Sequence, residues 1–166
     1  MLFSKELGEI KEATRTVEVL KENIDQLNEN NLQDKTKAKQ LLINLYYLTG
    51  YILECSIKYG IYKVISFDPN SEIESLSTNS VSYSDIKYHR FSRYSDYLVS
   101  KSPGIKLVDD KRNINSDIIY LYNNWDAPVR YWYKSIDDSM NRKLNKNNLF
   151  EFFNYAKHAF NHIARL

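Results

Sequence analysis

The sequence predicts an all-α fold, an antiparallel helical bundle of four main helices and one short helix. Apolar residues recur at spacings of three, four or seven over long stretches, which is the period of a helix with one buried face. With only 4 Gly and 3 Pro, those stretches are rarely interrupted. No pair of segments makes a candidate β-hairpin. The length of 166 residues and a hydrophobic content of 43% fit a single domain, 1–166, with a core of its own.

The first two helices are expected at 3–29 and 35–66, separated by the polar run NENNLQDK. The first carries one apolar stripe, whereas the second is apolar on most of its faces and is therefore expected in the middle of the bundle. Gly50 and Gly60 lie inside the second helix, where each costs about 1 kcal/mol relative to alanine. A close approach of neighbouring helices would explain both glycines.

The second half of the chain is expected to add three helices after a polar internal loop at 66–84. A short helix is expected at 84–100. The fourth helix should run over 114–139, with a kink near Asn124 because Pro128 lacks a backbone donor. The last helix should open on a capping-box-like pair, Asn148 and Glu151.

Composition limits the class of protein. The single cysteine, Cys55, cannot form an internal disulfide, and no apolar run reaches the ~18–20 residues needed to span a bilayer, so a cytoplasmic protein is expected. The net charge of +2 is too small to indicate a nucleic-acid partner by itself. The 14 tyrosines fit a compositional bias shared with Asn, Lys and Ile, or alternatively platforms for base stacking.

No cofactor or metal site is expected from the motifs. The chain contains no glycine-rich phosphate loop, no G-x-S-x-G elbow and no CxxC pair. His158 and His162 share a helix face at a spacing that can ligate zinc, but the segment HAFNH lacks the glutamate of a metalloprotease motif.

Two segments carry a family resemblance: YLTGYILECSIKYGIYKVI at 47–65 and IIYLYNNWDAPVRYWY at 118–133. They resemble the HEPN family, helical domains named for higher eukaryotes and prokaryotes nucleotide-binding. Further parts of the family pattern are matched by YHRFSRYSDYL at 88–98 and by these residues: Gly50, Glu54, Lys58, Trp125, Arg130 and Tyr131.

The resemblance implies a set of ligand-binding residues, namely Glu54, Lys58, His89, Arg90, Arg93, Arg130 and Tyr131. Each has a structural alternative. Glu54 and Lys58 are one helical turn apart and could simply form an ion pair. Arg130 could pair in the same way with Asp126. His89, Arg90 and Arg93 form either a phosphate-binding corner or a solvated helix face.

Catalytic HEPN ribonucleases carry an arginine, four to six further residues and a histidine. No histidine here has an arginine at that distance upstream, and the nearest match is Lys157 with His162. A lysine offers a phosphate a point charge, whereas arginine offers a planar fork. The sequence therefore favours a non-catalytic domain that binds RNA, a nucleotide or a protein partner.

Two alternatives remain at this point. One is a metal-independent ribonuclease toxin that uses Lys157 and His162 across a dimer. The other is a purely structural protein-interaction bundle. A homodimer or a partner protein such as a nucleotidyltransferase, and a setting in bacterial toxin–antitoxin or antiphage defence, are implied by the resemblance alone.

Overall fold

The computed structural model describes residues 3–28, 30–91, 94–105, 107, 115–131 and 136–166. Within these residues the regular structure is helical, apart from an isolated antiparallel bridge between Ser77 and Ser82. The prediction of an all-α bundle is therefore confirmed. In the same part of the chain, no helix combines the length and the apolar character needed to cross a membrane.

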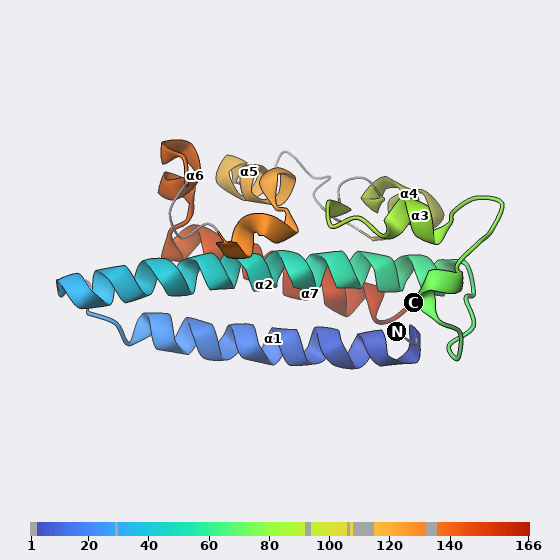
Figure 1. Ribbon diagram of the computed structural model, residues 1–166, viewed down its shortest axis with the longest axis horizontal. Helices are drawn as coiled ribbons and strands as arrows, with labels where there is room; N and C mark the ends of the chain where they lie inside the picture. The colour runs from blue at the N-terminus through green and yellow to red at the C-terminus, as the bar shows by residue number, and fades with distance from the viewer. Residues whose placement is uncertain (1–2, 29, 92–93, 106, 108–114, 132–135) are drawn as a thin grey trace.

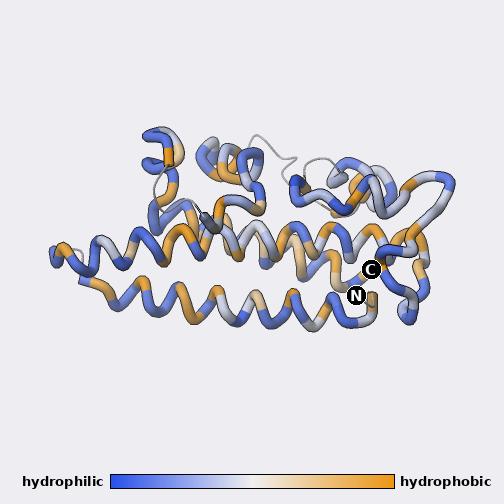
Figure 2. The backbone as a smooth tube through the Cα atoms, in the orientation of Figure 1, coloured by the Kyte–Doolittle hydropathy of each residue, from blue (hydrophilic) through white to orange (hydrophobic). Residues whose placement is uncertain are grey.

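Three long helices frame the molecule: α1 (Phe3–Asp25), α2 (Leu32–Val64) and α7 (Lys146–Ile163). α1 runs antiparallel to α2 along one side, while α7 packs on another side of α2 and runs in the same direction as α2 (Figure 1). Hydrophobic and hydrophilic residues alternate along α1, as expected for a helix with one buried face (Figure 2). The prediction that the second helix lies in the middle of the bundle is confirmed by its buried residues, which face several directions.

The remaining helices are short, and apart from the first of them they lie on the side of α2 opposite α1 (Figure 1). They are η1 (Ile73–Ser75), α3 (Tyr83–Ile86), α4 (Ser95–Lys101), α5 (Ser116–Asn124), η3 (Ala127–Tyr131) and α6 (Asp138–Lys143). The single helix expected at 84–100 is thus two helices, with residues 87–91 forming part of the connection between them.

The prediction of one kinked helix over 114–139 is wrong. α5 ends at Asn124, Trp125 is extended (φ −73°, ψ 135°), and the chain resumes as the 3-10 helix η3. Pro128 provides no backbone N–H for the Asn124 carbonyl, and its ring would clash with that carbonyl in a continuous helix, so α5 ends at Asn124 rather than bending. The fourth main helix of the prediction is therefore replaced by α5, η3 and α6.

Asparagine side chains cap the starts of two of the three long helices, α2 and α7. Asn31 caps α2, its Oδ1 accepting from the Gln33 N–H at 2.8 Å. Asn145 caps α7 in the same way, its Oδ1 accepting from the Asn148 N–H at 2.9 Å. The predicted capping pair of Asn148 and Glu151 is therefore wrong, because α7 begins at Lys146, almost a turn earlier.

The two glycines of α2 allow close packing, as expected. A Cβ atom at Gly60 would lie 2.9 Å from Leu98 and 3.0 Å from Ile163. At Gly60 these neighbours are side chains of α4 and α7, whereas at Gly50 the close neighbour is the side chain of Trp125, just after α5, since a Cβ atom would lie 2.0 Å from its Nε1. That indole N–H donates to the Tyr47 carbonyl at 3.2 Å, which holds the ring flat against α2.

We predict that Gly50→Ala lowers the free energy of unfolding by about 3 kcal/mol, because the added methyl group overlaps the Trp125 ring. Urea denaturation measures the change. Gly8→Ala in α1 is the matched control: a Cβ atom at Gly8 has nothing within 4 Å, so this change should stabilise by about 0.5–1 kcal/mol. Equal effects of the two substitutions would contradict the packing described here.

Candidate functional site

A buried carboxylate on α2 joins three of the residues predicted to bind a ligand. The Glu54 side chain is 5% exposed, and its Oε1 accepts from Nζ of Lys58 at 2.6 Å. Nδ1 of His89 lies 3.1 Å from the same oxygen, a hydrogen bond in the tautomer that carries the proton on Nδ1. His89 is 35 residues further along the chain, in the connection between α3 and α4. The structure thus brings Glu54, Lys58 and His89 together.

Lys58 is nearly enclosed by this arrangement. Its side chain is 14% exposed, and its ammonium group lies 5.6 Å from the ring centre of Tyr94. A buried ammonium group requires a nearby negative charge and can also use an aromatic face. The ion pair expected as the structural alternative for Glu54 and Lys58 is therefore formed. The same pair holds His89 at the surface, and ligand binding by these residues stays a prediction.

A fourth titratable group, Glu6 of α1, was missed by sequence reasoning. Its side chain is buried, and Oε2 has no hydrogen-bond partner among the described residues. Burial raises the pKa of Glu6 from 4.5 to about 7, against the opposing effect of the Lys58 ammonium group. The sequence does carry a signal for the burial of Glu6, because this residue lies on the apolar stripe of α1 between Phe3 and Ile10.

The thiol of Cys55 is adjacent to this cluster and is unsuited to nucleophilic chemistry. Burial, and next the Glu54 carboxylate, raise the pKa of Cys55 to about 12. The thiolate is the reactive form of cysteine, so this group stays protonated and inert at neutral pH. Cys55 is partly buried and packs against the hydrophobic core.

The connection that carries His89 is fastened to the segment after α5 as well as to α2. Nε of Arg90 lies 3.4 Å from Oδ2 of Asp126. The next residue, Phe91, stacks on Trp125 with ring centres 5.2 Å apart and an angle of 22° between the planes. Asp126 is thus paired with Arg90, and the Arg130 side chain, its expected partner, lies outside the described part of the structure. Arg93 also lies outside the described residues.

The surface above these contacts exposes basic and aromatic side chains. His89 and Arg90 are 60% and 61% exposed, and their neighbour Tyr88 is 47% exposed. Tyr131, at the end of η3, is 68% exposed. Tyr131 lies five residues of 3-10 helix beyond Asp126, a rise of about 10 Å along η3. We call the exposed set Lys87, Tyr88, His89, Arg90 and Tyr131 the linker face.

The residues of the expected nuclease pair have separate surroundings within one chain. Nζ of Lys157 lies 2.6 Å from Oε1 of Glu18 on α1. His162 instead packs beside His158, with ring centres 4.7 Å apart. Five residues of helix turn by about 140°, so Lys157 and His162 face different directions. A site formed across a dimer stays a prediction.

No group of three or more His, Cys, Asp or Glu side chains could hold a metal ion within the described residues. His158 and His162 therefore have no third ligand there.

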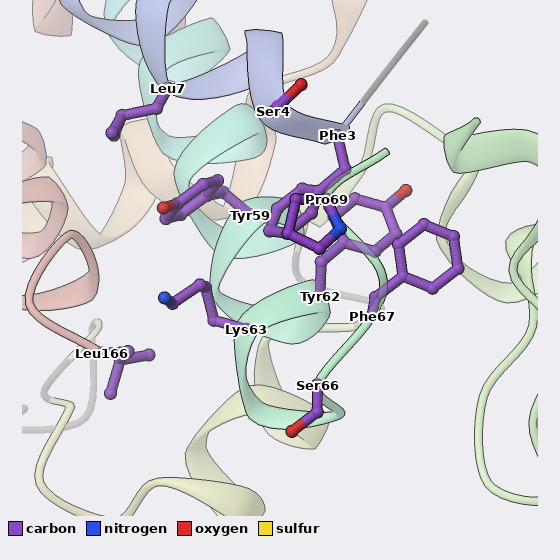
Figure 3. Close-up of a pocket in the computed structure, with 10 residues that line it drawn as sticks. All are labelled: Phe3, Ser4, Leu7, Tyr59, Tyr62, Lys63, Ser66, Phe67, Pro69 and Leu166. Carbon is purple, nitrogen blue, oxygen red and sulfur yellow. The ribbon is translucent and has the colours of Figure 1, made fainter. Parts of the chain in front are cut away.

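A pocket of about 510 Å³ lies where α1 begins and α2 ends, and none of the predicted site residues lines it (Figure 3). Its wall combines aromatic rings with the hydroxyl of Tyr59 and the ammonium group of Lys63, which Figure 3 shows on the side facing Leu166.

Comparisons of the chain with protein-family models, with curated proteins and with solved structures give no match.

We predict that Glu54→Ala lowers the free energy of unfolding by about 3 kcal/mol, because it leaves the Lys58 ammonium group enclosed without its counter-ion. Thermal and urea unfolding measure the loss. The double variant Glu54→Leu/Lys58→Met is the control. It removes both charges and should recover most of the stability, because a well-packed apolar pair can replace a buried ion pair. A double variant as unstable as Glu54→Ala would argue against the unpaired charge as the cause.

Proposed function

We propose that this chain is a non-catalytic, HEPN-like helical domain that binds single-stranded RNA through the linker face. The observation that carries the proposal is the double attachment of the 87–91 connection, to Glu54 through His89 and to Asp126 through Arg90. This attachment brings Arg90 and Phe91 next to Trp125 and Asp126, which come from a distant part of the sequence.

The chemistry of the linker face suits a flexible strand with exposed bases. Tyr88 and Tyr131 present ring surface on which bases can stack, a contact worth about 1–3 kcal/mol per base. The guanidinium group of Arg90 contacts Asp126 through Nε, which leaves its terminal N–H groups for a phosphate. His89 offers Nε2 to solvent while Nδ1 faces Glu54.

Stacking should contribute more to binding than charge. Asp126 offsets much of the positive charge of Arg90, and Glu54 is shared between Lys58 and His89. Few unbalanced cations therefore face solvent, so few phosphates would be neutralised. With about two phosphate contacts, the logarithm of the association constant should fall with the logarithm of salt concentration at a slope near −1.4.

The absence of catalysis is supported by the environment of the expected nuclease pair. Glu18 holds the Lys157 ammonium group, and that charge is directed away from the His162 ring. A ribonuclease that worked through this pair would need its second residue from another chain. Assembly as a homodimer, or with a partner such as a nucleotidyltransferase in a defence system, rests on the resemblance and is proposed on that ground.

We predict that the chain binds a fluorescent single-stranded RNA oligonucleotide in low salt and that Tyr131→Ala weakens the binding about 5- to 150-fold. This range corresponds to the loss of one stacked base. Fluorescence anisotropy measures the affinity, and Tyr131→Phe should keep it because the ring is retained. Lys39→Ala is the control, since Lys39 is an exposed cation on α2 away from the linker face. Equal affinities of wild type and Tyr131→Ala would contradict the proposed surface.

We also predict no RNA cleavage by the purified chain in EDTA, with the His162→Ala variant indistinguishable from wild type. Gel analysis of the same oligonucleotide after long incubation provides the test. If the wild type cleaves the RNA and His162→Ala abolishes the cleavage, the ribonuclease alternative is correct and the non-catalytic proposal is wrong. In that case Lys157→Ala should lose the activity as well.

A further inference from the structure

One ammonium group faces two carboxyl groups in the interior between α1 and α2. Nζ of Lys58 donates to Glu54 at 2.6 Å, whereas Glu6 receives no hydrogen bond on its buried Oε2. A carboxylate that is buried without a hydrogen bond or a counter-ion of its own is strongly disfavoured. The charges of the three groups therefore cancel when the Lys58 ammonium group pairs with the Glu54 carboxylate and Glu6 carries a proton.

The other titratable groups around Glu6 do not compensate for an additional negative charge. On α2 they are Glu54, Cys55, Lys58 and Tyr62, and on α1 the neighbour is Glu9. Among these described groups Lys58 is the cation, and Glu54 already engages it. The hydroxyl of Tyr62 is buried without a hydrogen-bond partner among the described residues. The amino-terminal end of α1 favours a negative charge in its first turn, but burial outweighs this effect, since the pKa of Glu6 is raised.

Glu6 occupies the part of α1 that closes the aromatic pocket. Phe3, Ser4 and Leu7 line one side of that pocket, and Tyr59, Tyr62 and Phe67 line the other (Figure 3). The start of α1 is held there by few polar contacts, which include the Phe3 N–H to the Ser71 carbonyl at 3.3 Å and the Ser4 N–H to the Pro69 carbonyl at 3.1 Å. A negative charge at Glu6 therefore weakens the packing of the start of α1 against α2, where α1 forms one side of the pocket.

We propose that Glu6 is a proton-gated latch, which holds the first two turns of α1 against α2 when neutral and releases them from the aromatic pocket when ionised. The release exposes the ring surface of Phe3, Tyr59 and Tyr62 at the pocket. The linker face lies on the side of α2 opposite α1, and the two features meet at the Glu54–Lys58 pair, which contacts His89 and acts on Glu6.

The sign of the pH dependence follows from proton linkage. The pKa of Glu6 is about 7 with α1 docked and near 4.5 with the carboxyl group in water. Docking therefore takes up a proton between these values, so docking weakens as pH rises from about 4.5 through 7 and is constant at higher pH. Acidification strengthens the latch, the opposite of the usual behaviour of a carboxylate in an ion pair.

Hydrogen exchange with mass spectrometry tests the latch on the full chain. After correction for the intrinsic rate, protection of the amides in residues 5–12 should fall roughly thirtyfold between about pH 5.5 and pH 8.5, a factor obtained from the two pKa values by linkage. Glu6→Gln keeps the shape without the charge, and its protection should be the same at both pH values. Glu22→Gln, at an exposed position further along the same helix, should behave as wild type.

Two results would overturn the latch. One is an equal pH dependence of residues 5–12 in wild type and Glu6→Gln, which would assign the effect to another group. The other is an equal loss of protection in the second half of α7, which would mean that the whole bundle opens rather than the start of α1.

Discussion

The burial of α2 on most of its faces is the constraint on which the rest of the structure depends. A helix of 33 residues is roughly 50 Å long, and an apolar surface of that length must be covered on several sides. α1 and α7 cover two sides along much of the helix, and the short helices cover a third (Figure 1). The short helices need not be regular, because each covers only a patch of α2.

Polar groups on such a helix must find partners inside the protein. Glu54 and Lys58 lie on α2 where α1, α4 and the 87–91 connection meet it, so their ion pair is largely withdrawn from water. The carboxylate then gains a further contact from His89, which fixes a segment that has little regular structure of its own. In this way one buried charge pair on the central helix positions the exposed residues of the linker face.

Sequence periodicity predicted the parts of the fold that depend on burial. The stripes at 3–29 and 35–66 led to α1 and α2 within a few residues, because a buried helical face leaves a repeated pattern. The segment around Pro128 was misjudged, since apolar residues at helical spacing are also compatible with two short helices and an extended residue between them. The start of α7 was misplaced because Asn145 and Asn148 are both good capping residues, and only the tertiary contacts of Asn148 decide between them.

The candidate site was predictable only where residues are close in the sequence. The one-turn spacing of Glu54 and Lys58 indicated a pair, but their contact with His89 depends on how the chain returns to α2 after residue 66, which no local pattern encodes. Glu6 was overlooked because a glutamate among apolar residues is usually read as the edge of a polar face. Its burial follows from the antiparallel packing of α1 on α2, which places it opposite Lys58.

Ultraviolet cross-linking of single-stranded RNA to the chain, with the linked peptides identified by mass spectrometry, tests whether RNA occupies the linker face. We expect adducts on the peptides that contain Tyr88 to Arg90 and Tyr131, the two segments that Asp126 and Arg90 bring together. Adducts concentrated on α7 around Lys157 and His162 would contradict it, because RNA would then occupy the expected nuclease pair instead of the linker face.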